Sequence, residues 1–152
     1  MSEKTKIILM SFLHEYIDLF QRGKKKIEFR KVILPENLRY ILVYQCVTLK
    51  KAVGYMDVKK VVSGTPNEIW VQYHHLSGIH RNVYDEYYAD SKKAVGIIIN
   101  RYFPFEKPVA LSDIDEHLNA PQSFCYLSEH MFAKTLALSS KTEFDNTVDN
   151  QY

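Results

Sequence analysis

Cysteine is scarce in this chain, which has two in 152 residues, Cys46 and Cys125, far apart in the sequence. They lack the Cys-x-x-Cys spacing of a zinc or redox site, and two distant cysteines do not make a disulfide framework. The six histidines show no metal-ligand spacing either. We therefore predict neither a bound metal nor a cofactor, and we interpret both cysteines as small buried apolar residues.

Long apolar runs are also missing, because no stretch of 18 or more apolar residues exists that could form a membrane-spanning helix. The first six residues, Met1 to Lys6, lack the pattern of a signal peptide. We therefore expect a cytoplasmic location and no membrane partner. The net charge of +2 gives little overall attraction to nucleic acid, so any such binding must rest on a local group of charges.

The chain does have the length for one domain with a sizeable core. We predict a single domain over residues 1–138 and a flexible tail over residues 139–152. Tyrosine (11) and phenylalanine (8) are abundant. Tyrosine often lines grooves, since its ring packs while its hydroxyl hydrogen-bonds, but half-exposed strands of a β-rich fold would account for most of these residues equally well.

The hydrophobic pattern predicts strands and helices in alternating blocks. Strands are expected in β-branched, aromatic and other apolar runs over 7–10, 27–32, 40–47 (a central strand), 52–62 and 94–100, and residues 102–105 extend or bend the last of them. Further ordered stretches are expected over 107–112, as an edge segment leading into a turn, and over 121–126. Helices are expected between Ser11 and Gly23 and over 67–74, 77–89 and 128–138. The order of these elements predicts a mixed α+β domain on a curled sheet, and small bent sheets of this kind often close into a barrel.

Individual residues mark the ends and irregularities of these elements. Ser11 is expected to cap the first helix and Gly23 to end it in a left-handed conformation. Thr65 is the expected cap of the helix that has Pro66 at its first position. Gly54, inside a strand, indicates a bulge or a close approach by a neighbour.

The most informative segment runs from Gly23 to Lys31 and reads GKKKIEFRK. Residues 22–31 carry six cations against Glu28 alone, a net charge of +5. Strand alternation places Ile27 and Phe29 on one face and Glu28 and Arg30 on the other. A carboxylate and a guanidinium side by side predict a small polar site, although a basic run of this kind is as often a solvated surface.

The segment resembles the motif of the ASCH family, Gly-x-Lys-x-x-Glu-x-Arg directly after the first helix, with Gly23, Lys25, Glu28 and Arg30 at its four positions. The residues around it are similar as well, over 9–12, 43–44, 53–54, 105–108 and 121–124, and the likeness covers roughly residues 6–127. The resemblance implies a PUA-like β-barrel with flanking helices, whose cleft beside the first helix contains the motif side chains.

The resemblance also implies functions. ASCH and related PUA-like domains are proposed to bind RNA or nucleotides, sometimes in transcription coactivators, so RNA or a nucleotide is the expected partner. The alternative is a small hydrolase or ribonuclease acting on RNA or modified nucleosides through Lys25, Glu28 and Arg30. One branch hydrolyses N4-acetylcytidine with a lysine, a threonine and a glutamate. Glu28 stands where that threonine would be, which argues against this activity.

The residue types of the motif suit a nucleotide. Lys25 and Arg30 are candidates to hold a phosphate or a base edge, and Glu28 to accept a hydrogen bond from an exocyclic amine. Stacking of a base is assigned to Tyr44 or to the tyrosine cluster at 84–88. A bulge after Gly23 would turn Lys25 rather than Lys24 or Lys26 into the cleft.

Two residues near the first helix complete the candidate set, Ser11 and His14, the latter as an ionisable side chain. A third hypothesis is a protein-interaction module that uses the tyrosine-rich surface from Tyr84 to Tyr88. The ligand and the oligomeric state stay open.

Overall fold

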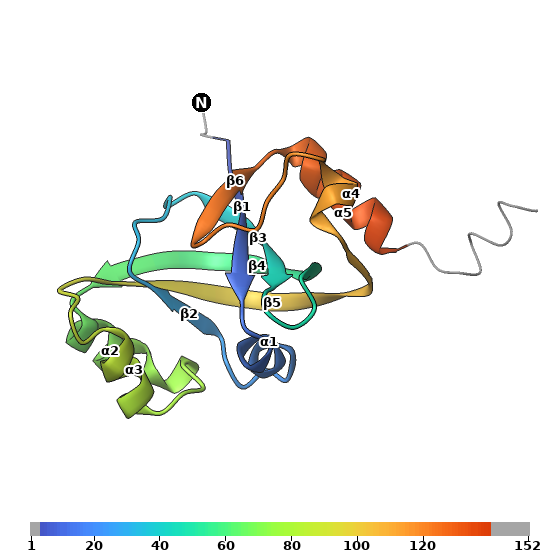
Figure 1. Ribbon diagram of the computed structural model, residues 1–152. Helices are drawn as coiled ribbons and strands as arrows, with labels where there is room; N and C mark the ends of the chain where they lie inside the picture. Colours follow the sequence, from blue (N-terminus) through green and yellow to red (C-terminus); the bar gives the residue numbers. More distant parts are fainter. Residues whose placement is uncertain (1–3, 141–152) are drawn as a thin grey trace, which may run out of the picture.

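The computed structural model describes residues 4–140, which form a mixed α+β domain built on one six-stranded sheet (Figure 1). The strands are β1 (Lys6–Phe12), β2 (Ile27–Arg30), β3 (Leu38–Gln45), β4 (Lys51–Gly64), β5 (Ala94–Val109) and β6 (Phe124–Leu127). The helices are α1 (His14–Gln21), α2 (Pro66–Tyr73), the single-turn η1 (His74–Leu76), α3 (Arg81–Tyr87), α4 (Leu111–Ile114) and α5 (Glu129–Ser139). The α+β class predicted from the sequence is confirmed.

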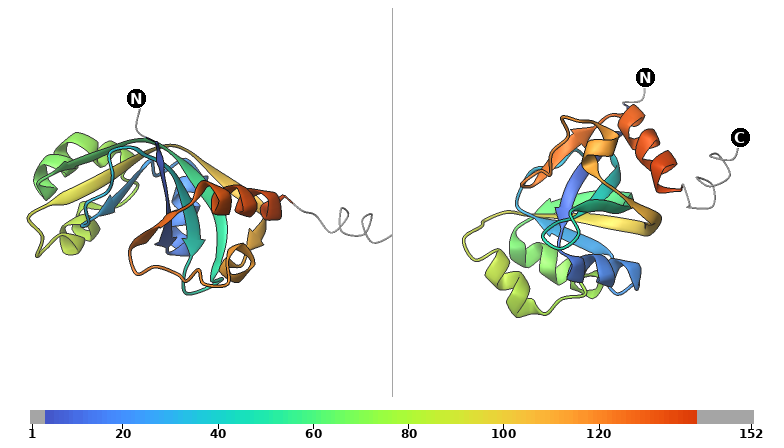
Figure 2. Two further views of the ribbon diagram at one scale, coloured as in Figure 1. Left: turned by 90° about the horizontal axis from the view of Figure 1, so that it is seen from above. Right: turned by 45° about the vertical axis from the view of Figure 1, so that its right-hand side comes forward.

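The sheet is curved, but among the described residues it stays open. Its strands lie in the order β2-β5-β4-β3-β1-β6, so β2 and β6 are its two edges and no ladder joins them. Neighbouring strands are antiparallel except β1 and β3, which pair in parallel across the α1 crossover. Figure 2 shows the bend, which the long strands β4 and β5 follow. The predicted closure into a barrel is therefore not confirmed, because a barrel requires the edges to pair.

Three groups of buried side chains hold the helices against the sheet. Ile17 and Phe20 of α1 pack with the first group, on one face of β1, β3 and β4. Phe132 of α5 belongs to the second group, on the other face of β1 and β3. Trp70 of α2 and Tyr84 of α3 cover β2 and the adjoining end of β5 in the third group. The helices thus lie on both faces, and α1 lies beside the α2–α3 pair.

Gly54 has both properties that the sequence predicted for it. The register between β4 and β5 shifts between Ala52 and Gly54. A Cβ atom at Gly54 would lie 2.4 Å from the hydroxyl of Tyr102 and 2.6 Å from the carbonyl oxygen of Phe103. Glycine is required here because the neighbouring strand approaches the backbone closely.

The helix boundaries confirm two of the predicted capping residues and correct a third. Thr65 accepts a hydrogen bond from the amide of Glu68 at the start of α2, and Gly23 follows α1 with a φ of 72°. Ser11 is not a cap, because it lies in β1 and α1 begins two residues after Phe12, with Leu13 in the capping position. The apolar spacing alone could not separate the end of the strand from the start of the helix.

The remaining segments differ from prediction mainly in length. The helix predicted over 77–89 is a loop up to His80 followed by α3. The strand predicted over 94–100, residues 102–105 and the start of the edge segment predicted over 107–112 form one continuous β5. The closing helix extends through Ser139, and the rest of the predicted tail, 141–152, lies outside the described residues. None of the helices within residues 4–140 has the length and apolar character needed to cross a membrane.

Candidate nucleotide site

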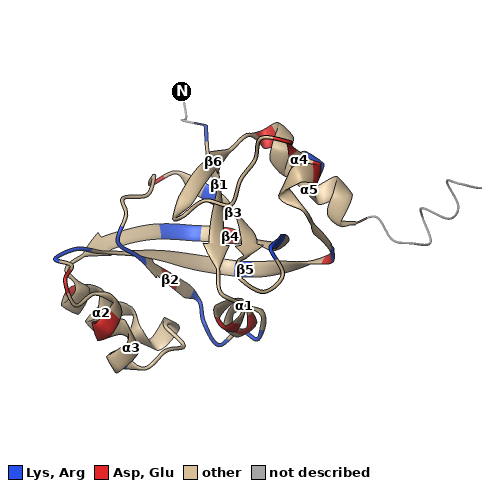
Figure 3. Cartoon of the chain, viewed as in Figure 1, with Lys and Arg blue, Asp and Glu red and all other residues tan. Residues whose placement is uncertain are grey.

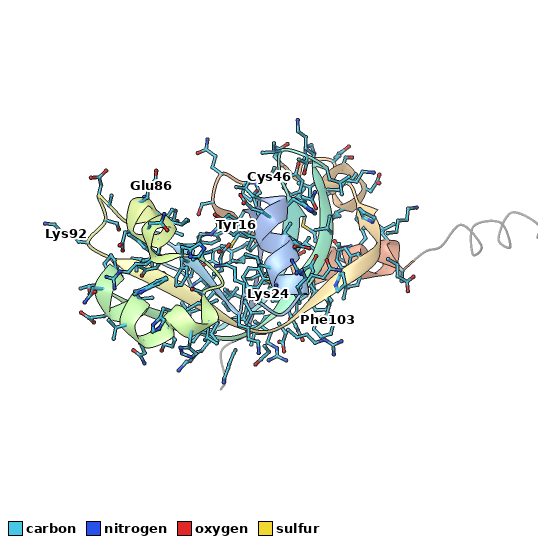
Figure 4. The ribbon with its side chains drawn as sticks, turned by 90° about the horizontal axis from the view of Figure 1, so that it is seen from below. Tyr16, Lys24, Cys46, Glu86, Lys92 and Phe103 are labelled. Carbon is cyan, nitrogen blue, oxygen red and sulfur yellow. The ribbon has the colours of Figure 1, made fainter. Side chains whose placement is uncertain are left out.

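A cavity of about 300 Å³ lies between α1, β2 and α3. Its walls combine aromatic and aliphatic side chains with two cations and one carboxylate; the lining residues are Ser11, Phe12, Leu13, Tyr16, Lys25, Glu28, Phe29, Arg30, Cys46, Ile79, Val83, Tyr84, Tyr87 and Gln122. In the view of Figure 4, Tyr16 lies on the side of α1 that faces α3. All three charged residues of the ASCH-like motif therefore meet in one cavity.

Lys25 is the buried cation of this cavity, with 2% of its surface exposed. The backbone turn at Gly23 directs its side chain inward, where its Nζ donates a hydrogen bond of 2.9 Å to the carbonyl oxygen of Ser77. The ammonium also lies 5.0 Å from the ring centre of Phe29 and 5.7 Å from that of Tyr16. Burial lowers the pKa of Lys25, Glu28 opposes this shift, and Arg30 adds to it.

Glu28 and Arg30 form an ion pair on β2. Oε2 of Glu28 accepts from Nη2 of Arg30 at 3.1 Å, and Oε1 accepts from the backbone amide of Phe29 at 3.2 Å. Nη2 of Arg30 also donates to the carbonyl oxygen of Ser11 at 2.9 Å, which joins β2 to the end of β1. Both charges are hydrogen-bonded, as partly buried charges must be to persist. The alternation predicted for this strand is confirmed, because Phe29 packs in the third core group.

Tyrosines from α3 form the wall opposite α1. The hydroxyl of Tyr84 donates to the carbonyl oxygen of Pro66, and burial raises its pKa to about 12. Tyr87 is 41% exposed, and the Nζ of Lys31 lies 4.7 Å from its ring centre at the rim. Burial raises the pKa of Tyr87 as well. Both hydroxyls stay protonated at neutral pH, so this wall supplies neutral rings for packing.

The other residues predicted for the site lie in three different settings. Ser11 lines the cavity, with its hydroxyl donating to the carbonyl oxygen of Pro121 and its own carbonyl accepting from Arg30. His14 is exposed at the start of α1, and Tyr44 is buried in the second core group. Neither His14 nor Tyr44 is among the residues that line the cavity. The structure thus brings together Ser11, Lys25, Glu28 and Arg30.

The loop from Ser77 to Ile79 contributes to the site without having been predicted. Gly78 has a φ of 65°, and a Cβ atom there would lie 2.7 Å from the carbonyl oxygen of Lys24 and 3.0 Å from the Cβ of Lys25. The loop therefore presses directly on the Gly23–Lys26 turn and presents the Ser77 carbonyl to the buried lysine. The signal in the sequence was Gly78 itself, because glycine is favoured where the backbone turns with φ above zero.

Among residues 4–140, no group of three or more histidine, cysteine, aspartate or glutamate side chains is arranged to hold a metal ion. The charged side chains that line the cavity are Lys25, Arg30 and Glu28. They leave it with a formal charge of +1 when Lys25 is protonated, which favours an anionic or partly anionic ligand.

Solved structures of ASCH proteins have the same fold. The chain matches the crystal structure of ASCH from Zymomonas mobilis with a TM-score of 0.80 and 25% identity, over 90% of this chain and 97% of that one. A serine-to-alanine mutant of the same protein gives a TM-score of 0.81 and 24% identity, over 89% of this chain and 97% of that one. The N-terminal domain of Staphylothermus marinus McrB gives a TM-score of 0.57 at 11% identity, over 89% of this chain and 95% of that one.

Curated relatives contain a similar segment inside larger proteins. Large ribosomal subunit protein uL22 of Ureaplasma parvum is 30% identical over 109 residues, which are 72% of this chain and 35% of the relative. ATP synthase subunit alpha of Ureaplasma parvum is 29% identical over 126 residues, which are 82% of this chain and 16% of the relative. The chain thus spans about a third of one relative and less of the other. No family model matches the sequence.

The fold and the cavity together define an α+β domain with a charged, aromatic-lined site beside its first helix. The chain is an ASCH-domain protein, in agreement with the motif from Gly23 to Arg30 and with the Zymomonas mobilis structures.

Proposed function

We propose that the protein binds single-stranded RNA by taking one nucleotide into the cavity at Lys25, Glu28 and Arg30. The observation that carries the proposal is the convergence of these three side chains, from β2 and the turn before it, in one cavity among aromatic rings. The cavity volume of about 300 Å³ is at the small end of ligand sites, which matches one nucleotide rather than an RNA duplex. Bases of single strands are free to enter such a site, whereas paired bases are not.

Each side chain has a role that fits a nucleotide. Arg30 has a planar fork of donors, and its hydrogen bonds to Ser11 and Glu28 both come from one of its terminal nitrogens. That leaves donors for a phosphate or a base carbonyl. Glu28 accepts hydrogen bonds, so an exocyclic amine such as that of cytosine is its natural partner. Tyr87, exposed at the rim beside Lys31, is the residue positioned to stack on a base.

The similar segments in the two relatives fit a domain that occurs within different larger proteins. One is named as a ribosomal protein and the other as an ATP synthase subunit, and each contains a segment similar to this chain within a longer sequence. The shared property is therefore assigned to the domain and its cavity. Binding of RNA in this way would serve RNA metabolism or transcription, in the location that the sequence leads us to expect, the cytoplasm.

The test is a binding measurement with short RNA. Fluorescence anisotropy of a labelled cytidine tetranucleotide, with cytidine 5′-monophosphate as unlabelled competitor, gives both affinities at several salt concentrations. We expect Arg30→Lys to weaken binding about tenfold or more, because a lysine lacks the further guanidinium donors that are left for the ligand, and bonds to charged groups are worth about 1.5–3 kcal/mol. We expect Glu28→Gln to weaken cytidine ligands more than uridine ligands.

The matched control is Lys60→Gln, which removes one exposed charge on β4 away from the cavity. A thermal melt of each variant separates lost binding from lost folding. If the wild type binds neither the tetranucleotide nor the mononucleotide at millimolar concentration, the proposal is wrong.

A hydrolase or ribonuclease is the second candidate, and the burial of Lys25 favours it. A lysine whose pKa is lowered by desolvation has a larger neutral fraction near neutral pH and can accept a proton in a reaction. Incubation of RNA and of N4-acylated cytidines with the wild type and with Lys25→Met, followed by chromatography, decides the matter. Turnover by the wild type that is lost in Lys25→Met would establish an enzyme, while binding without turnover retains the first proposal.

A further inference from the structure

A second cleft lies at the C-terminus of α1, between this helix and β5. Its volume is about 430 Å³, and it is lined by Phe20, Gln21, Gly23, Lys25, Lys26, Ile99, Asn100, Arg101, Tyr102 and Pro104. Its lining contains three cations and no carboxylate. The first cavity, by contrast, balances its cations with Glu28. The two hollows therefore differ in the kind of ligand group that they would hold.

The carboxylate opposite Arg101 in the sheet pairs with a different cation. Asp57, opposite Arg101 in the β4–β5 register, pairs with Arg39 and accepts a hydrogen bond from Asn100. Arg101 itself rests on a ring, with its guanidinium carbon 4.8 Å from the ring centre of Phe103. No ion pair involving Lys26 or Arg101 occurs within the described residues, so their charges are available to an anion.

The helix end beside the cleft does not cancel these charges. A helix C-terminus presents carbonyl oxygens that disfavour anions. Here the carbonyl of Leu19 accepts from the amides of Lys24 and Lys25, and the carbonyl of Phe20 accepts from that of Gly23. The turn therefore satisfies these acceptors with its own amides, and the lysine side chains dominate the local field.

We propose that this second cleft is a phosphate subsite, in which Lys26 and Arg101 hold the backbone of the strand whose nucleotide occupies the first cavity. The inference rests on the proposed RNA binding and extends it from one nucleotide to an oriented strand. Phosphate contacts of this kind position a strand without reading its sequence.

The position of Lys25 connects the two hollows. Its side chain lines both of them, so they are separated by little more than one residue. Lys24 and Lys26 are exposed on the turn that separates them. Figure 3 shows the connection between α1 and β2 as a mostly basic segment. A strand that leaves the first cavity across this turn meets a continuous line of positive charge, which gives the basic run a function beyond solvation.

The experiment compares ligands of increasing length on the wild type, Lys26→Gln, Arg101→Gln and the control Lys60→Gln. The probes are cytidine 5′-monophosphate, cytidine 5′-triphosphate and the cytidine tetranucleotide. We expect Lys26→Gln and Arg101→Gln to leave monophosphate binding unchanged and to weaken the tetranucleotide several-fold. The slope of log affinity against log salt for the tetranucleotide should fall by about 0.7 for each phosphate that a variant no longer binds.

Each outcome bears on one of the two proposals. An equal loss for the triphosphate would support the phosphate subsite and assign it to the phosphates of a free nucleotide. Monophosphate binding with a tetranucleotide that binds no more tightly, or Arg101→Gln indistinguishable from Lys60→Gln, would overturn the subsite and leave the proposed function intact. Failure of every ligand to bind the wild type would overturn both.

Discussion

The protonation of Lys25 gives a direct test of the cavity as described. Burial lowers its pKa from the ordinary value of 10.5, with Glu28 opposing and Arg30 assisting the shift. Between the lowered pKa and 10.5 the unfolded chain keeps a proton that the folded chain has released. The unfolded state then binds more protons, so the free energy of unfolding rises with pH across this window. Below it, the cost of the buried charge is present in full.

The size of the effect follows from linkage. Each unit by which the pKa is lowered corresponds to about 1.4 kcal/mol, and the slope approaches this value per pH unit where the two states differ by a whole proton. The hydrogen bond from Nζ to Ser77 favours the charged lysine and therefore reduces the shift. The slope of the free energy of unfolding against pH measures the net result of burial and hydrogen bonding. A difference in packing between variants that does not change with pH leaves this slope unaffected.

The assay is urea unfolding of the wild type, Lys25→Met and Lys24→Met between pH 6.5 and 10.5. Methionine has a similar length and no charge, and Lys24 is the exposed neighbour of Lys25. We expect the stability of the wild type relative to Lys25→Met to rise as pH increases, and its stability relative to Lys24→Met to stay constant. Parallel curves for the wild type and Lys25→Met over the whole range would refute the lowered pKa.

The same contacts lead to three further predictions. Gly54→Ala should lower the free energy of unfolding by about 1–3 kcal/mol, measured by urea unfolding, because its Cβ overlaps Tyr102, while nucleotide affinity of the folded fraction should not change. Gly78→Ala should lower the free energy of unfolding by about 1–2 kcal/mol because of the positive φ alone. It should also weaken nucleotide binding, because the added Cβ displaces the turn that holds Lys25. Unchanged affinity would contradict the role of this loop. Affinity for cytidine 5′-monophosphate should fall as pH rises through the lowered pKa of Lys25, and a titration series from pH 6 to 9.5 measures it.

Local rules predicted the parts of the site that depend on neighbours in the sequence. Alternation placed Glu28 and Arg30 on one face of β2 because side chains of a strand alternate regardless of the rest of the fold. The left-handed conformation of Gly23 could be predicted because a glycine directly after a helix commonly ends it in this way. Lys25, which the sequence analysis preferred over Lys26, is buried and lines the first cavity, whereas Lys26 is exposed.

The parts that depend on distant segments could not be predicted in this way. The acceptor for Lys25 is a backbone carbonyl 52 residues away, and every residue has such a group, so no side chain marks it. Tyr44 has the residue type of a stacking platform, but its position in central β3 places it in the second core group. Whether the sheet closes depends on whether β2 meets β6, which no local pattern encodes.

The two proposed subsites can be separated by mutation because each has an arginine that the other lacks. Arg101 touches only the second cleft and Arg30 only the first, whereas Lys25 lines both. Within residues 4–140, Glu28 pairs with Arg30 and no carboxylate is hydrogen-bonded to Lys25. A ligand phosphate in either hollow would therefore stabilise the protonated form of Lys25. Lys25→Met is therefore expected to weaken the mononucleotide and the tetranucleotide together, Arg101→Gln the tetranucleotide alone. The reverse pattern would place the base in the second cleft and the phosphate in the first cavity.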